Sequence, residues 1–190
     1  MNIPASSTLP PLSWSALRAG RYVIDPSHTR VLFSVSHFGL STFFGEFTRP
    51  VGALLFDPAR LSAARLSVSV PVANIATQNQ VLDEELRSSD WLDSARFPQL
   101  ELDSSKCILQ SDGSLDVHAE MRLHGVSRQL VLTATLAGAG VNPKNQTYTV
   151  GFDVRGSLRR SDFGVTALPL IGDELQMIIS AAFEFAPEQH

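Results

Sequence analysis

The chain has 190 residues, of which 44% are hydrophobic and 18% are charged, a composition typical of one globular domain. Fifteen Lys and Arg against nineteen Asp and Glu leave a formal charge of -4. A nucleic-acid partner requires a basic face, so we predict none. Polar residues interrupt every apolar run before the ~20 residues that a membrane-spanning helix needs, so we predict no transmembrane segment.

The N-terminal residues 1–20 are rich in Ser and Pro, and Pro4, Pro10 and Pro11 favour a flexible arm with at most a short helical turn near Trp14. We expect the folded domain to cover residues 21–187. The arm lacks the basic and apolar regions of a secretory signal. From the residues alone we therefore expect a cytoplasmic protein, or one whose export signal has been removed.

Short runs of alternating apolar and polar residues follow, which is the pattern of antiparallel strands with one dry and one wet face. The run 29–38 places Val31, Phe33, Val35 and His37 on one face. The run 66–72 likewise places its Leu and Val residues on one face of a strand. Each run therefore predicts a strand with one apolar wall.

The run 45–57 does not keep one register, because Phe47 is at an odd position whereas Leu54 and Phe56 are at even ones. Pro50 and Gly52 lie between them. We predict one strand with a β-bulge at this point.

One segment interrupts the strands. Residues 77–80, Thr-Gln-Asn-Gln, fit a capping box that begins a helix at Thr77, and Val81, Leu82 and Leu86 follow at helical spacing. A second short turn carries Trp91. We predict a short helical insert near residues 78–95.

The C-terminal half contains a predicted β-hairpin that turns at Gly125, a strand around Phe152, and a closing strand that carries Met177 and Ile179 on one face. About eight strands without βαβ alternation predict an all-β fold, an antiparallel barrel that is closed or nearly closed. A two-sheet sandwich is the competing architecture.

Several motifs in this order resemble the YceI-like family. They are the segments 22–28 (YVIDPSH), 31–39 (VLFSVSHFG), 45–47 (GEF), 86–93 (LRSSDWLD), 97–98 (FP), 124–126 (HGV) and 160–164 (RSDFG). The resemblance implies an extended, lipocalin-like barrel whose pore binds polyisoprenoid lipids, including isoprenoid quinones. It also implies a periplasmic location, since many members of that family are exported.

The resemblance favours an apolar isoprenoid lipid, a quinone or a polyprenyl chain, as the ligand, with no other cofactor. The candidate ligand-binding residues share an apolar character or a place in the apolar rows and the helical insert. They are Phe33, Val35, His37, Phe43, Phe47, Leu54, Phe56, Leu66, Val68, Val70, Leu82, Leu86, Trp91, Leu102, Met121, Leu123, Phe152, Phe163, Met177 and Ile179. His37 continues an apolar row and is the candidate contact for the head group; the alternative is a core histidine that is hydrogen-bonded to a neighbouring backbone group. Periodicity alone favours a barrel core packed solid by its own side chains, whereas the resemblance favours an interior wide enough to accept a lipid chain.

No residue pattern indicates catalysis. His118 and His124 lie six residues apart, about 20 Å along a strand, too far to share a metal ion. The chain contains no Gly-x-Ser-x-Gly motif, and Cys107 is expected to be a small buried side chain. We predict a protein that is not an enzyme and has no catalytic or metal-binding residues.

Three alternatives stay open: a fatty-acid or fatty-amide binding protein, a lipid-modifying enzyme with a His-containing pocket, and a solid-cored interaction module. A homodimer also stays open, because a barrel can pair through an exposed face. The motif at residues 160–164 has two interpretations. In one, Arg160 pairs with Asp162 across a turn while Phe163 plugs the barrel; in the other, Arg160 contacts a ligand head group.

Overall fold

The structure is a computed structural model and describes residues 13–186. Its one α-helix over this range is α1 (Gln80–Arg87), and short 3-10 helices lie at Trp14–Ala16, Leu61–Ala63, Val72–Asn74 and Arg160–Phe163. The strands are β1 (Gly20–Ile24), β2 (Arg30–His37), β3 (Ser41–Phe47), β4 (Val51–Phe56), β5 (Arg65–Pro71), β6 (Ile75–Ala76), β7 (Gln99–Leu109), β8 (Leu115–Leu123), β9 (Val126–Val141), β10 (Tyr148–Arg159) and β11 (Ile171–Phe185).

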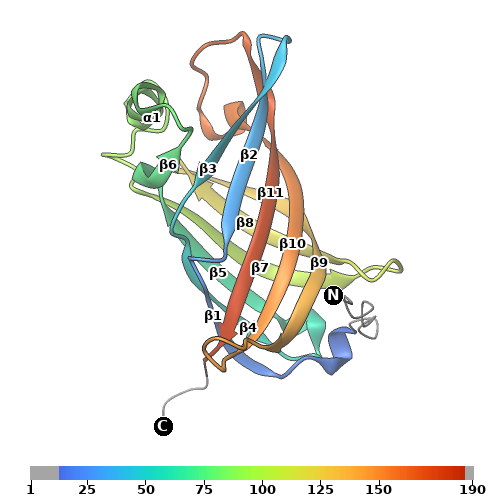
Figure 1. Cartoon of the computed structure of the whole chain (residues 1–190). Helices are drawn as coiled ribbons and strands as arrows, with labels where there is room; N and C mark the ends of the chain where they lie inside the picture. Colours follow the sequence, from blue (N-terminus) through green and yellow to red (C-terminus); the bar gives the residue numbers. More distant parts are fainter. Residues whose placement is uncertain (1–12, 187–190) are drawn as a thin grey trace, which may run out of the picture.

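Eight of these strands close a barrel (Figure 1). The order is β1, β4, β5, β7, β8, β9, β10 and β11, each antiparallel to the next, and β1 pairs with β11. The register that closes the barrel joins Tyr22 to Phe185 and Ile24 to Phe183. The predicted antiparallel barrel of about eight strands is confirmed, and the sandwich is wrong because one continuous sheet runs around the molecule.

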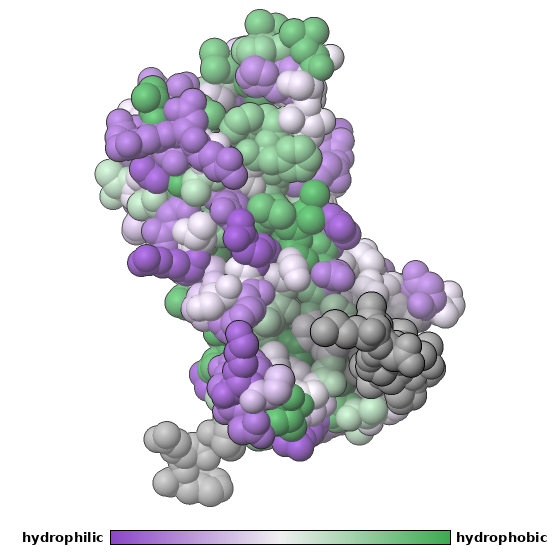
Figure 2. Space-filling model, in the orientation of Figure 1, coloured by the Kyte–Doolittle hydropathy of each residue, from purple (hydrophilic) through white to green (hydrophobic). Residues whose placement is uncertain are grey.

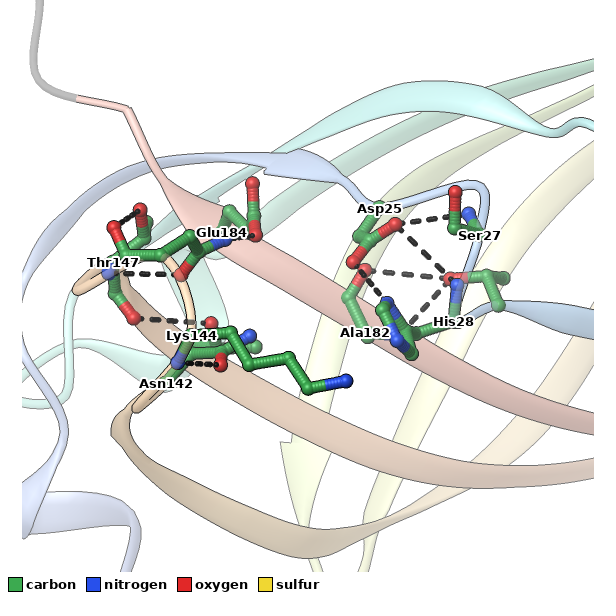
Figure 3. Close-up of polar contacts among 11 residues, drawn as sticks. Asp25, Ser27, His28, Asn142, Lys144, Thr147, Ala182 and Glu184 are labelled. Atoms are coloured by element: carbon green, nitrogen blue, oxygen red, sulfur yellow. Dashed lines mark hydrogen bonds and ion pairs between the residues drawn. The ribbon is translucent and has the colours of Figure 1, made fainter.

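The long strand β11 has two partners along the same edge. Its last residues pair with β1, whereas Ile171–Ser180 pair with β2. Ala182 lies between the two ladders. Its carbonyl oxygen accepts the Asp25 N–H at 2.8 Å, and its own N–H donates to Thr29 Oγ1 at 3.0 Å (Figure 3). The β1–β2 turn therefore replaces the missing ladder bonds, and the sheet branches there.

The branch is completed by β3, which pairs with β2, and by the two-residue strand β6, which pairs with β3. On this side the sheet has no ladder between β3 and β5. The connecting segment 72–98, which contains α1, takes the place of a strand, and the Val72 N–H donates to the Pro98 carbonyl oxygen at 2.9 Å.

The expected β-bulge at residues 45–57 is wrong. The chain forms two separate strands there, β3 on the branch and β4 in the closed barrel. Arg49 between them has a φ of 59°, and the fully buried Pro50 has no N–H to offer a ladder. The change of parity thus marks the end of one strand and a bend into the next.

The predicted hairpin between β8 and β9 is confirmed. Buried and less buried residues alternate along β8, as the sequence pattern requires. His124 and Gly125 have φ values of 51° and 73°, which is the geometry of a two-residue turn that follows the twist of its strands. A Cβ at Gly125 would lie 2.5 Å from the Phe97 ring, so this turn packs closely against the end of the connecting segment 72–98.

The helical insert exists, but its start and its extent differ from the prediction. Asn79 caps α1, because its Oδ1 accepts the N–H groups of Val81 and Leu82. Thr77 instead donates its hydroxyl and its N–H to Asp83. After Arg87 the chain continues in turns up to residue 97, so the second half of the predicted range is not helical.

The folded region begins before the predicted boundary at residue 21. Trp14 is buried, stacks on Phe152 with ring centroids 5.8 Å apart, and donates its Nε1–H to the Gly113 carbonyl oxygen at 2.8 Å. Leu17 is buried as well. This part of the expected arm therefore belongs to the core, and residues 1–12 lie outside the described range.

Candidate ligand cavity

The barrel interior contains a cavity of about 240 Å³. All eight strands of the closed barrel contribute side chains to it, and so do β2, β3, β6, α1 and the turns after α1. Apart from Thr29, Cys107 and Arg160, every lining residue is apolar. The cavity is therefore suited to a hydrocarbon ligand rather than to a polar substrate.

Most of the candidate ligand-binding residues line this cavity. These are Phe33, Phe47, Leu54, Phe56, Leu66, Val68, Val70, Leu86, Trp91, Leu102, Met121, Leu123, Phe152, Met177 and Ile179. They come from strands far apart in sequence, and barrel closure brings them together.

Five candidates lie outside the lining. Val35 is buried but is not among the residues that line the cavity. His37, the predicted head-group contact, and Phe43 lie further along the β2–β3 hairpin, and the His37 ring packs 4.2 Å from the Phe38 ring. Leu82 is on α1, outside the cavity lining.

The fifth, Phe163, is almost completely buried. Its carbonyl oxygen lies 3.0 Å from His124 Nδ1, which must therefore be the donor.

The sequence did not single out several lining residues. Leu132, Ala134 and Val154 face inward on β9 and β10, and their alternation would have identified them. Trp14 had only one signal, a lone aromatic residue within a Ser- and Pro-rich segment. Val165 had none, because its position depends on how the loop after residue 163 folds back.

That loop is held by Arg160, whose guanidinium is buried. Its Nε donates to the Gly172 carbonyl oxygen at 3.1 Å, and its four terminal N–H groups donate to four more carbonyl oxygens. These acceptors are Val165 (3.1 Å), Ala167 (2.6 Å), Leu168 (3.0 Å) and Ile171 (3.0 Å). Arginine has five N–H donors, and all five are used here.

Both predicted roles of Arg160 need correction. Among the described residues its side chain forms no ion pair with Asp162, and in this conformation it has no donor left for a head group. Its charge also lies over the Trp91 ring, 5.8 Å from the centroid. Trp91 in turn donates to Glu85 on α1 at 3.1 Å. Arg160 thus joins the loop 164–170 and the start of β11 to the insert.

The cavity lining contains one thiol, that of Cys107. Burial raises the pKa of the Cys107 thiol, although Arg65 lowers it slightly, so this thiol stays protonated at neutral pH. Between residues 13 and 186, no three His, Cys, Asp or Glu side chains gather as a metal ion would require.

Comparison with known proteins agrees with this architecture. A family model described as a YceI-like domain matches residues 22–183. The chain belongs to the YceI-like family. A UPF0312 protein of Pseudomonas savastanoi pv. phaseolicola is 33% identical over 156 residues, which cover 81% of each chain. A UPF0312 protein of Vibrio cholerae is 29% identical over 155 residues, 80% of this chain and 82% of the relative.

Solved structures with the same fold include BcnA of Burkholderia cenocepacia, with a TM-score of 0.75 at 20% identity over 84% of this chain and 98% of that one. A polyisoprenoid binding domain from Saccharophagus degradans matches with a TM-score of 0.64 at 12% identity, covering 87% and 98% of the two chains. These likenesses establish the YceI-like barrel. Within the described residues, no helix is long and apolar enough to cross a membrane.

Proposed function

We propose that this YceI-like protein binds the tail of an apolar isoprenoid lipid, an isoprenoid quinone or a polyprenyl chain, and carries or stores it without catalysis. The observation that carries the proposal is the closed barrel cavity with its almost entirely apolar lining. Membership of the YceI-like family supports it, as does the polyisoprenoid binding of the domain from Saccharophagus degradans with the same fold.

The size of the cavity sets what it holds without rearrangement. An engineered apolar cavity of about 150 Å³ binds benzene, so 240 Å³ accommodates roughly ten carbon atoms, or two isoprene units. Burying ten carbons contributes about 8 kcal/mol, equivalent to micromolar affinity before the cost of ordering the chain. No polar anchor is then required. A longer tail needs a wider cavity, and the flexible Met121 and Met177 side chains on the wall can repack to provide it.

The proposal is tested by filling the cavity. Ala134 on β9 lines it, whereas Val131 on the same strand faces solvent. We expect Ala134→Phe to lose most of the copurifying lipid, because the added ring occupies the space of the tail. Val131→Phe, the matched control, should retain the wild-type amount. Native mass spectrometry followed by solvent extraction measures both.

The identity of the extracted molecule decides among ligands. An isoprenoid at close to one molecule per chain supports the proposal. A fatty acid or fatty amide would instead assign the cavity to straight chains. A measured mass equal to that of the protein without lipid, unchanged after incubation with quinones and polyprenyl lipids, would overturn the proposal in favour of a solid-cored module.

We also propose a periplasmic location, on the ground of family membership. Fractionation of bacterial cells that produce this chain, with an antibody against it, tests the proposal, and recovery in the cytoplasmic fraction alone would refute it.

A further inference from the structure

Five large apolar side chains are exposed at one end of the barrel. We call this group, Phe38, Leu40, Phe44, Leu168 and Leu170, the apolar tip. Leu40 is 86% exposed and Leu170 is 75% exposed. The first three lie on the β2–β3 hairpin and the other two on the loop 164–170. Backbone pairing of His37 with Ile171 places these two connections side by side. Figure 2 shows hydrophobic residues gathered at this end, above the hydrophilic insert.

Charged residues are absent from both segments that build the apolar tip. Residues 31–45 and 163–172 contain no Asp, Glu, Lys or Arg, although 18% of the chain is charged. A solvated loop usually carries polar or charged residues, and exposed apolar clusters mark contact with a partner or a membrane.

The backbone of the tip is also strained. Phe38 and Leu168 have φ values of 56° and 47°, a region that bulky side chains rarely adopt. The Leu168 carbonyl oxygen accepts one of the Arg160 hydrogen bonds, and the Ile171 N–H donates to the same oxygen at 3.0 Å. These hydrogen bonds thus fix the Leu168 backbone, with its apolar side chain exposed, at a conformational cost, a pattern that is found at functional sites.

We infer that the apolar tip docks this protein on a lipid bilayer by inserting into its surface. The inference rests on the proposed function, since an isoprenoid carrier must exchange its ligand with the membrane in which such lipids dissolve. The loop 164–170 connects the ligand cavity with the proposed membrane-docking surface. Val165 lines the cavity, and Leu168 and Leu170, three and five residues later, lie at the tip.

A bilayer fits the tip better than a protein partner does. A standard protein interface uses about 20–30 residues on each side, whereas the tip has five on two projecting connections (Figure 1). The tip carries no charge with which to select a charged partner. Insertion driven by apolar side chains should therefore be insensitive to salt.

The test is flotation of the purified full chain with phosphatidylcholine vesicles at low and high salt. We expect wild-type protein to float with the vesicles under both conditions. The variant Leu40→Asp/Leu170→Asp should partition at least about tenfold less. The matched control is Leu109→Asp/Val141→Asp. Leu109 and Val141 are 50% and 51% exposed at the C-terminal ends of β7 and β9, outside the two segments that build the apolar tip. The control should float as wild type does. Circular dichroism confirms that the exposed substitutions leave the fold intact.

Three results would overturn the inference. The tip variant could float as well as wild type. Binding could require anionic lipid and disappear in salt. Sedimentation could show a wild-type dimer that the tip variant converts to a monomer, with no vesicle binding, so that the tip joins two copies. Lipid extraction from the same preparations keeps the two proposals apart, because a chain that retains isoprenoid but does not float refutes docking alone.

Discussion

Arg160 illustrates how one side chain can organise a loop that has no regular structure. Five carbonyl oxygens between residues 165 and 172 converge on its guanidinium. Buried carbonyl groups require donors, and a planar fork satisfies several of them at once. The side chain therefore supports both the cavity wall at Val165 and the apolar tip.

We expect Arg160→Lys to lower the free energy of unfolding by about 2–4 kcal/mol, although it keeps the positive charge, because lysine has three donors and no planar fork. Urea denaturation measures the change. Arg159→Lys, at an exposed neighbouring position, is the control and should change stability by less than about 0.5 kcal/mol. Equal midpoints for wild type and Arg160→Lys would show that charge alone holds the loop.

Asp25 stabilises the turn at which the sheet branches. Partial burial raises the pKa of its carboxyl, but hydrogen bonds from the His28 ring and from the Ser27 and His28 N–H groups lower it more, so the pKa lies below its usual value of 3.8 (Figure 3). A carboxyl with a lowered pKa in the folded state contributes stability above its unfolded pKa. That stability is lost as the pH falls through the folded pKa.

The variant Asp25→Asn should therefore be less stable than wild type by on the order of 1 kcal/mol at pH 7. The difference should shrink as the pH falls below about 4, where Asp25 of the unfolded chain becomes protonated, and it should be lost below the lowered pKa of the folded state. Urea denaturation of both proteins at pH 7 and pH 3 measures it. A difference that does not change with pH would mean that the Asp25 charge does not matter to the turn.

At the scale of elements, β2 and β3 depend on a glycine opposite an aromatic ring. Phe33 pairs with Gly45, and a Cβ at Gly45 would lie 2.3 Å from the Phe33 ring. We expect Gly45→Ala to displace this cavity-lining ring and to lower stability by about 1–3 kcal/mol. The same substitution in a Phe33→Ala background should cost much less, since the clash is gone. Equal costs in the two backgrounds would exclude the clash as the cause.

The elements differ in how far the sequence predicts them. The period-2 pattern of β8 determines both the strand and its inner face. The parity change before β4 correctly indicates a break but does not distinguish a bulge from a strand end, because that depends on which neighbour each half meets. Helical spacing located α1, yet Thr77 and Asn79 both suit a helix cap. In the structure Thr77 forms local hydrogen bonds with Asp83, and Asn79 is the cap.

The candidate site was predictable where it follows alternation, as for Leu54 on β4 and Met177 on β11. It was not predictable where a loop folds back. Alternation along β2 continues to His37, but the cavity lining on this strand does not extend beyond Phe33. The donors of Arg160 meet acceptors whose positions no local pattern encodes.

On the scale of the whole molecule, the ends of the folded chain meet. Tyr22 is fully buried, its hydroxyl donates to the Arg18 carbonyl oxygen at 2.6 Å, and its ring contacts the Phe185 ring edge-on at 5.3 Å. Burial and the nearby Tyr148 raise the pKa of Tyr22 to about 12, although Arg18 lowers it, so its hydroxyl remains a donor across the physiological range.

The seam between β1 and β11 has a consequence for how the protein is made. It joins residues near opposite ends of the chain, and β11 also supplies the partner edge for β2. Neither the barrel nor the β2 branch is complete until β11 has left the ribosome. Pairings of such long range close late and slowly. The ligand cavity therefore does not exist on the nascent chain before β11 emerges, and any lipid must enter after β11 has paired with its neighbouring strands.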